Sequence, residues 1–257
     1  MEDIFDLLGE DVHISKDGKT LTEILDMQAE HITIPDGIEV IRERAFMWSS
    51  LHSIDLPASV TTIEQYAFDG CKSLQSIDIP ASVTEIGEGA FEGCESLGSI
   101  NVAEDNEYYT STDGVLYSKD LTIIKRVPIG AELKSFSIPN SVTTIGNGAF
   151  TDCETLQSVD IPNGSTTIEM EAFRRCISLQ SIDIPSSVMK IGWLAFWMCC
   201  NLQSIHMHST DVERLDIGKN AFDNVDKEMC TLYVPAGTKE TYSNHPVFGE
   251  FKKIVEE

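Results

Sequence analysis

Residues 74–96, LQSIDIPASVTEIGEGAFEGCES, decide the fold, because most of the chain consists of copies of this stretch. Further copies begin at Leu51, Leu97, Leu156, Leu179 and Leu202, with a degenerate copy near Glu30 and a longer one at Leu133. The proline after the first apolar run recurs at intervals of 22, 23, 59, 23 and 23 residues, as Pro35, Pro57, Pro80, Pro139, Pro162 and Pro185. A fixed period of this length is typical of a solenoid, in which each coil contacts mainly its neighbours.

Each copy predicts a short strand, a second extended run and a tight turn. In residues 77–79 two isoleucines alternate with an aspartate, which predicts a strand with one buried face. Pro80 ends this strand because proline has no N–H to donate to a ladder. Residues 83–86 predict a second extended run, and residues 87–94 predict one helical or 3-10 turn that points Phe91 inward. A single copy cannot offset the cost of ordering it, roughly 1.5 kcal/mol per residue, so only a stack of copies is stable.

The pattern L-x-x-I-x-I-P-x-S-V-T-x-I-G-x-x-A-F-x-x-C recurs from about Ile32 to Phe222 and resembles the BspA-like (Treponema-type) leucine-rich repeats of bacteria and some protists. Residues 109–120 and 232–239 also match habits of that family. The resemblance implies a β-rich α/β solenoid, a curved array with a parallel β-sheet on its concave face and short helical or 3-10 turns. It also implies a cell-surface or secreted protein whose repeats bind other macromolecules and are not catalytic.

The repeat predicts a single leucine-rich-repeat solenoid over residues 1–257. We expect an N-terminal cap, a run of repeats and a C-terminal cap, at residues 1–29, 30–222 and 223–257. Caps are needed because an uncovered terminal coil would expose its core. A longer unit at 103–132 interrupts the repeats, and there residues 115–117 and 121–124 flank a short polar turn and predict a β-hairpin.

The chain is strongly acidic, with 18 Lys and Arg against 42 Asp and Glu and a formal net charge of −24. This balance disfavours nucleic acid and anionic membrane surfaces as partners. We interpret the charge mainly as a source of solubility, with a preference for a basic partner as the functional alternative. Residues 1–6 show no signal-peptide pattern and no apolar run is long enough to span a membrane, so we expect no membrane insertion. The expected location is the cell surface or secretion by resemblance, and the cytoplasm is the alternative.

The sequence offers no constellation for catalysis, a cofactor or a metal. Five of the seven cysteines share one repeat column and predict small buried thiols rather than a disulfide framework: Cys71, Cys94, Cys153, Cys176 and Cys199. The glycines of residues 87–93 are spaced wrongly for a dinucleotide-binding loop. His206 and His208 share a strand face but have no clear third zinc ligand, Asp183 being the one nearby candidate.

Exposed columns of strand residues are the first candidates for contact with a partner. Stacked strands place equivalent residues about 4.8 Å apart, so each column forms a line of similar side chains. These columns predict a polar, partly acidic concave face that contains Asp55, Asp78, Asp160, Asp183, Gln157, Gln180 and His206. These columns contain no exposed aromatic residue.

The second candidate site is where the repeat departs from its own pattern. Aligning residues 191–199 on residues 86–94 places large apolar groups where the other copy has glutamate or glycine: Trp193, Leu194, Trp197 and Met198. Trp193 and Trp197 are four residues apart, so on a helical turn they share a face. One interpretation is that the irregular segment 208–220 or the C-terminal cap covers them, and the other is that they form an exposed patch that anchors a protein partner. Met47 and Trp48 show a smaller version of the same departure.

We therefore predict a monomeric, non-enzymatic module that binds a protein partner, with host or cell-surface adhesion as one setting. A carbohydrate-binding surface module is the first alternative, and the lack of an aromatic platform in the strand columns disfavours it. A hydrolase that uses strand aspartate pairs is the second. It needs two carboxylates in different environments, whereas Asp55 and Asp78, like Asp160 and Asp183, occupy equivalent positions.

Overall fold

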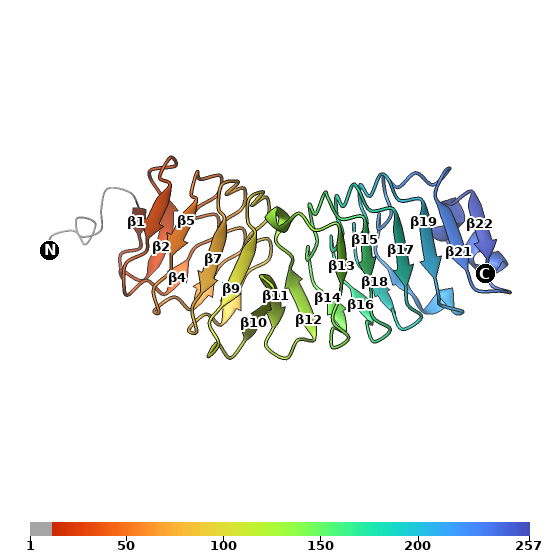
Figure 1. The fold of residues 1–257 in the computed structure, drawn as a ribbon, viewed down its shortest axis with the longest axis horizontal. Coiled ribbons are helices and arrows are strands. Elements are labelled where there is room, and N and C mark those ends of the chain that lie inside the picture. The colour runs from red at the N-terminus through yellow and green to blue at the C-terminus, as the bar shows by residue number, and fades with distance from the viewer. Residues whose placement is uncertain (1–11) are drawn as a thin grey trace. The chain divides into compact units, whose positions relative to one another are not determined.

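The computed structural model describes residues 12–257, so the first eleven residues of the expected N-terminal cap lie outside it (Figure 1). The chain divides into two compact units, which we describe separately. Among the described residues, the N-terminal unit contains 12–120 together with Pro128–Ala131, and the C-terminal unit contains Leu121–Val127 and Glu132–Glu257. Each unit is a β-solenoid with a repeat of about 23 residues, parallel strands and few helical residues, which confirms the predicted fold class.

In the N-terminal unit, two sets of short strands run along the stack. One set has the order β1 (Val12–Ile14), β2 (Thr20–Ile24), β4 (Val40–Ile41), β6 (Thr62–Ile63) and β8 (Glu85–Ile86), with only the first pair antiparallel. The other set consists of two parallel pairs, β3 (His31–Thr33) with β5 (Ser53–Asp55), and β7 (Ser76–Ile79) with β9 (Ser99–Val102). A 3-10 helix, η2 (Ile129–Ala131), belongs to this unit.

The longer repeat at residues 103–132 contains a strand that the repeat pattern does not predict. Strand β10 (Tyr109–Thr112) pairs antiparallel with β11 (Val115–Ser118) around a turn at Asp113 and Gly114. Both turn residues have positive φ, 51° and 76°, as a two-residue hairpin turn requires. The family-like segment 109–120 therefore forms a hairpin of its own.

The C-terminal unit repeats the arrangement and ends in a cap. Parallel pairing joins β12 (Ile123–Arg126), β14 (Thr144–Ile145), β16 (Thr167–Ile168), β18 (Lys190–Ile191) and β20 (Asp216–Ile217). It also joins β13 (Ser135–Ser137) to β15 (Ser158–Asp160), and β17 (Ser181–Ile184) to β19 (Ser204–Met207), β21 (Thr231–Val234) and β22 (Lys253–Glu256). The helical elements are η3 (Val212–Arg214), α1 (Lys239–Asn244) and η4 (Phe248–Glu250).

The register of these strands agrees with the sequence alignment. Asp78 pairs with Asn101 in one unit, and Asp183 pairs with His206 in the other. Regular pairing is interrupted once in each unit, between β5 and β7 and between β15 and β17. At these two points the neighbouring strands are still joined by a backbone bond, from Gln75 N–H to the His52 carbonyl and from Gln180 N–H to the Gln157 carbonyl, each 3.1 Å long, and the pairing of β6 with β8 and of β16 with β18 is uninterrupted.

The core consists of columns of identical side chains. The phenylalanine rings of the Ala-Phe pairs are buried and stacked in each unit, as Phe46 on Phe68 at 5.0 Å and Phe173 on Phe196 at 5.2 Å. The cysteine column is buried too, and its thiols donate to the preceding coil, Cys94 to the Phe68 carbonyl at 3.1 Å, for example. The predicted burial of both columns is confirmed.

The tight turn around each Ala-Phe pair, here called the Ala-Phe turn, has two left-handed positions. These are the residue before the alanine and the second residue after the phenylalanine. The first column is Arg44, Tyr66, Gly89, Gly148, Glu171, Leu194 and Asn220, and the second is Trp48, Gly70, Gly93, Asp152, Arg175, Met198 and Asn224. In this conformation the N–H groups point along the stack, as Tyr66 N–H does to the Glu88 carbonyl at 3.0 Å and Gly70 N–H to the Glu92 carbonyl at 2.8 Å.

Candidate functional site

Residues 192–198 form the sixth Ala-Phe turn, here called the tryptophan turn. Its four large apolar residues differ in solvent exposure. Trp193 is 45% exposed, whereas Leu194, Trp197 and Met198 are half-buried. The segment 208–220 contacts the backbone of this turn, because Leu194 N–H donates to the Lys219 carbonyl at 3.4 Å. It nevertheless leaves nearly half of the Trp193 surface accessible to solvent.

Leu194 and Met198 occupy the two left-handed positions of the tryptophan turn, with φ of 55° and 60°. Residues with a Cβ rarely adopt this conformation, and the equivalent positions two coils earlier include Gly148. Backbone bonds to the next coil compensate for this cost, such as that from Met198 N–H to the Asp223 carbonyl at 3.0 Å. The turn therefore holds these side chains in a conformation that the stack imposes.

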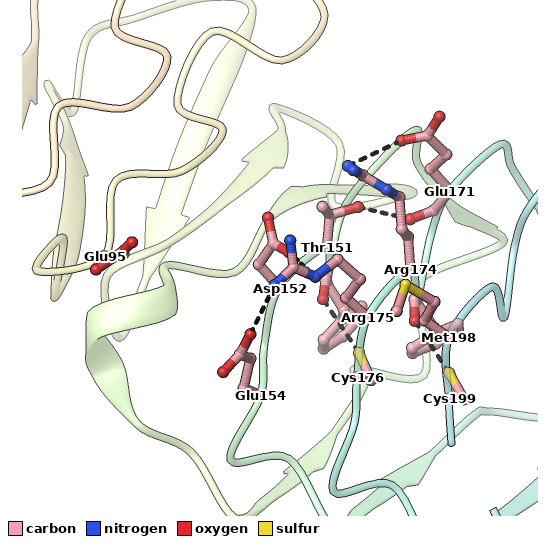
Figure 2. Close-up of polar contacts among 12 residues, drawn as sticks. Glu95, Thr151, Asp152, Glu154, Glu171, Arg174, Arg175, Cys176, Met198 and Cys199 are labelled. Atoms are coloured by element: carbon pink, nitrogen blue, oxygen red, sulfur yellow. Dashed lines mark hydrogen bonds and ion pairs between the residues drawn. The ribbon is translucent and has the colours of Figure 1, made fainter. Parts of the chain in front are cut away.

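A network of charged side chains from the preceding coils supports the tryptophan turn (Figure 2). The guanidinium of Arg174 lies 5.5 Å from the centre of the Trp197 ring and 3.4 Å from the carboxylate of Glu171. Arg175 forms ion pairs with Asp152 and Glu154 at 3.2 Å and 3.1 Å. The ring of Trp197 is thus covered by a cation of its own chain, and Trp193 is the more accessible indole.

In the N-terminal unit, two of the predicted aspartates line one shallow groove of about 440 Å³. Asn101 donates from its side-chain amide to Asp78 Oδ1 at 2.8 Å, and Thr33 donates to Asp55 Oδ2 at 3.3 Å. The groove floor is mainly apolar, with Ile54, Leu56, Ala58, Ile79, Pro80, Val102 and Ala103. The two carboxylates are both exposed and both accept hydrogen bonds from neighbours in the same column.

In the C-terminal unit, the column that contains Asp160 and Asp183 continues to the imidazole ring of His206. Asp160 accepts a bond from Ser137 Oγ at 2.7 Å, and Asp183 lies 3.2 Å from His208 Nε2. His206 Nδ1 lies 3.1 Å from a carboxylate oxygen of Glu257. The two histidines therefore contact different carboxylates, and within residues 12–257 no three His, Cys, Asp or Glu side chains converge as metal ligands.

The His206 column continues to Tyr233, a neighbour that the repeat period does not predict. The two rings stack at 4.4 Å with an interplanar angle of 7°. The column that the repeat predicts as polar therefore extends to a half-buried aromatic ring in this unit. A fixed period does not reveal this neighbour, because Ser204 pairs with Thr231 and the intervening coil is longer than the repeat. The side chains of Gln157 and Gln180, one coil apart, remain exposed.

The buried thiols of the C-terminal unit are poor nucleophiles. Burial raises the pKa of Cys153 and of Cys230 to about 12, and raises the pKa of Cys176 well above its usual range. In the N-terminal unit the pKa of Cys71 is lowered instead, by a hydrogen bond with the side chain of Cys94. Cys71 is itself buried, so a substrate cannot reach it.

Several solved structures share this fold. A leucine rich cell surface protein from Faecalibacterium prausnitzii is 31% identical with a TM-score of 0.65, over 83% of this chain and 62% of that one, so this chain spans less than two thirds of that relative. The pneumococcal vaccine antigen PcpA is 23% identical with a TM-score of 0.66, over 89% and 68% of the two chains. A leucine-rich repeat protein from Eubacterium ventriosum is 21% identical with a TM-score of 0.59, over 85% and 72%. The last two likenesses concern the fold alone.

None of the curated proteins matches the chain. Among residues 12–257 no helix is both long enough and apolar enough to cross a bilayer. The family profile described as the BspA type leucine rich repeat region matches six copies, over residues 26–127 and 129–245. The repeats, their register and this match agree, and the chain belongs to the BspA-type leucine-rich repeat family.

Proposed function

We propose that the chain is a non-enzymatic module that binds a protein partner, and that the tryptophan turn is a contact site. The observation that carries this proposal is the exposure of Trp193, at 45%, in a turn that presents four large apolar residues. Tryptophan is enriched among the residues that contribute most to binding energy in protein interfaces. Half-buried neighbours then provide the apolar surroundings that exclude water from such an anchor.

The arrangement of charges supports a protein partner at this turn. Arg174 and Arg175 are already paired with carboxylates of their own unit, so the turn adds little to the net charge of the protein. On a chain with a net charge of −24, a nearly neutral apolar turn is where a neutral or acidic protein surface meets the least repulsion. The exposed carboxylates and amides of Asp55, Asp78, Asp160, Asp183, Gln157 and Gln180, with His206, are then polar contacts that add specificity.

The geometry disfavours hydrolysis. A pair of catalytic carboxylates needs two environments that separate the pKa values of acid and base. Asp55 and Asp78 are instead both exposed and both bonded to neighbours in one column. The thiols that are buried do not offer an accessible nucleophile either.

The geometry also disfavours a sugar platform on the strand columns. Sugars stack on an open ring face, whereas the facing sides of His206 and Tyr233 cover each other. The cell-surface setting that we propose for this module is supported by the Faecalibacterium relative, which is described as a cell surface protein.

The test is capture of partners from the native surroundings by the full chain, followed by hydrogen exchange on the isolated complex. We expect a protein partner that protects residues 192–198 and that is lost with Trp193→Ser. Met229→Ser is the matched control, because Met229 is an apolar residue of the same unit that is 65% exposed. A partner that binds Trp193→Ser and the native chain equally, or protection confined to other turns, would contradict the proposed site.

A further inference from the structure

We propose that Trp48, on the first Ala-Phe turn of the N-terminal unit, is a receptor for an arginine side chain of a partner protein. This site lies in a different unit from the tryptophan turn. The inference goes beyond the proposed function, because it assigns a second site and names the chemical group that the site takes.

The backbone at Trp48 indicates that stability alone does not explain this residue. Its φ is 61°, and the residues at the same place in the next two coils are Gly70 and Gly93, with φ of 69° and 66°. Glycine adopts this conformation without cost, whereas a tryptophan there is strained. The Trp48 side chain is 68% exposed, so its burial offsets little of the conformational strain. Since Asp152, Arg175 and Met198 occupy the same left-handed position in the other unit, the conformation belongs to the turn, and the open indole is what distinguishes Trp48.

The indole of Trp48 is held in place by the coil that follows it. A Cβ on Gly70 would lie 2.1 Å from Trp48 Cδ1 and 2.8 Å from Nε1, so the ring rests on the Gly70 backbone. The backbone N–H of Trp48 donates to the Asp69 carbonyl at 2.8 Å. One side of the indole is therefore supported by the solenoid, and a ligand that stacks on the ring does not have to order it first.

Two other aromatic residues of the Ala-Phe turns show which group fits such a ring. Tyr66 has the guanidinium of Arg44 at 5.3 Å from its ring centre, and Trp197 has that of Arg174 at 5.5 Å. In both pairs the arginine occupies the same position as the aromatic residue, one coil earlier. The chain itself thus uses arginine over an aromatic ring wherever the preceding coil provides one.

Trp48 has no arginine in the preceding coil. Ile24 N–H donates to the Ala45 carbonyl as Phe46 N–H donates to the Ala67 carbonyl, so Ile24 corresponds to Phe46 and Asp26 to Trp48. Asp26 is exposed, and a carboxylate cannot take the place of a cation over a ring. Within residues 12–257, no cationic group and no other ring lies over the indole of Trp48.

The charge of the site favours a cation from outside. The net charge of the chain is −24, which attracts a basic partner, and the coil next to Trp48 presents a carboxylate in the corresponding position. A planar guanidinium both stacks on an indole and pairs with a carboxylate, and it is more weakly hydrated than the ammonium group of lysine. Arginine therefore suits the site better than lysine.

The test uses ¹⁹F NMR on the chain labelled with 5-fluorotryptophan, which reports separately on the three tryptophans. The probe is a hexapeptide of alternating glycine and arginine, and the same peptides with lysine or with uncharged citrulline are controls. We expect the arginine peptide to shift the Trp48 resonance and to bind at least about threefold more weakly to Trp48→Gly. This variant keeps the net charge and restores the glycine that the next two coils carry, so it is expected to fold.

Tyr108→Ser removes another exposed aromatic residue of the same unit, which is 52% exposed, and is expected to bind the arginine peptide like the native chain. Equal binding by Trp48→Gly and the native chain would overturn the proposal, because diffuse negative charge alone would then hold the peptide. Equal binding of the lysine or citrulline peptide would overturn the assignment to arginine. Trp193→Ser is expected to leave this binding unchanged, so failure at Trp48 is distinguishable from failure at the tryptophan turn.

Discussion

Trp48 in the N-terminal unit and Trp197 in the C-terminal unit both lie on Ala-Phe turns, yet one indole is open and the other is covered. Trp197 is half-buried beneath Arg174, whereas Trp48 is 68% exposed and corresponds in register to Asp26. The backbone scaffold is the same in both units. The two indoles occupy different positions of the turn, and Trp197 is in addition covered by the arginine one coil earlier in its own column, whereas Trp48 has no such cover among the described residues.

If the two units have equivalent cores, truncation of a stacked phenylalanine should lower the free energy of unfolding equally in each. Phe68→Ala and Phe173→Ala each remove a ring stacked between two others, so each should lower the free energy of unfolding by about 3–5 kcal/mol. Urea unfolding of the two variants measures it. A loss below about 1 kcal/mol in one unit only would show that the cores are not equivalent.

A smaller loss is expected at alkaline pH, again in both units. Burial raises the pKa of Tyr117 in the N-terminal unit and of Tyr242 in the C-terminal unit to about 12, from an ordinary value of 10.0. The folded state therefore favours the neutral phenols, and the stability they contribute is present below pH 10 and is lost as the pH rises towards 12. Urea midpoints measured across this range should fall, and Tyr242→Phe should reduce the fall.

Gly70→Ala and Gly148→Ala test two left-handed glycines, of which Gly70 lies beneath the ring of Trp48 and Gly148 lies beneath no ring of the described residues. Both residues have positive φ, 69° and 58°, so alanine should cost roughly 1–2 kcal/mol in either unit. Only at Gly70 does the new methyl group meet an indole, that of Trp48. Equilibrium unfolding gives the cost, and increased acrylamide quenching of Trp48 in Gly70→Ala alone would show that its ring had been displaced.

Arg174→Ala should expose the ring of Trp197 to solvent, as the ring of Trp48 is exposed in the native chain. It removes a cation–π contact, which is expected to cost about 0.5–1 kcal/mol, and leaves the phenylalanine stack intact. Acrylamide should then quench Trp197 more strongly, while Trp48 is unchanged. Lys219→Ala, an exposed cation beside the same turn, is the matched control. If the quenching of Trp197 did not change, Arg174 would not be what covers it.

The sequence by itself determined the solenoid, its repeat and its strand register. Identical residues recur every 22 or 23 positions, and the Asp78–Asn101 and Asp183–His206 pairs follow directly from that alignment. The burial of the phenylalanine and cysteine columns follows as well, because a core shared by all coils constrains every copy in the same way. The departure of residues 193–198 from the pattern was also visible.

Only the tertiary structure decided which of these departures are open to solvent. The fixed period fails where coils differ in length, so it placed neither Tyr233 next to His206 nor β10 next to β11. Nor does a repeat alignment show that Trp48 rests on Gly70 or that Arg174 lies over Trp197. Of these residues, Trp48 and Gly70 occupy left-handed positions of an Ala-Phe turn, whereas Arg174 and Trp197 do not. Their partners are residues of neighbouring coils, in the very columns where the repeat varies.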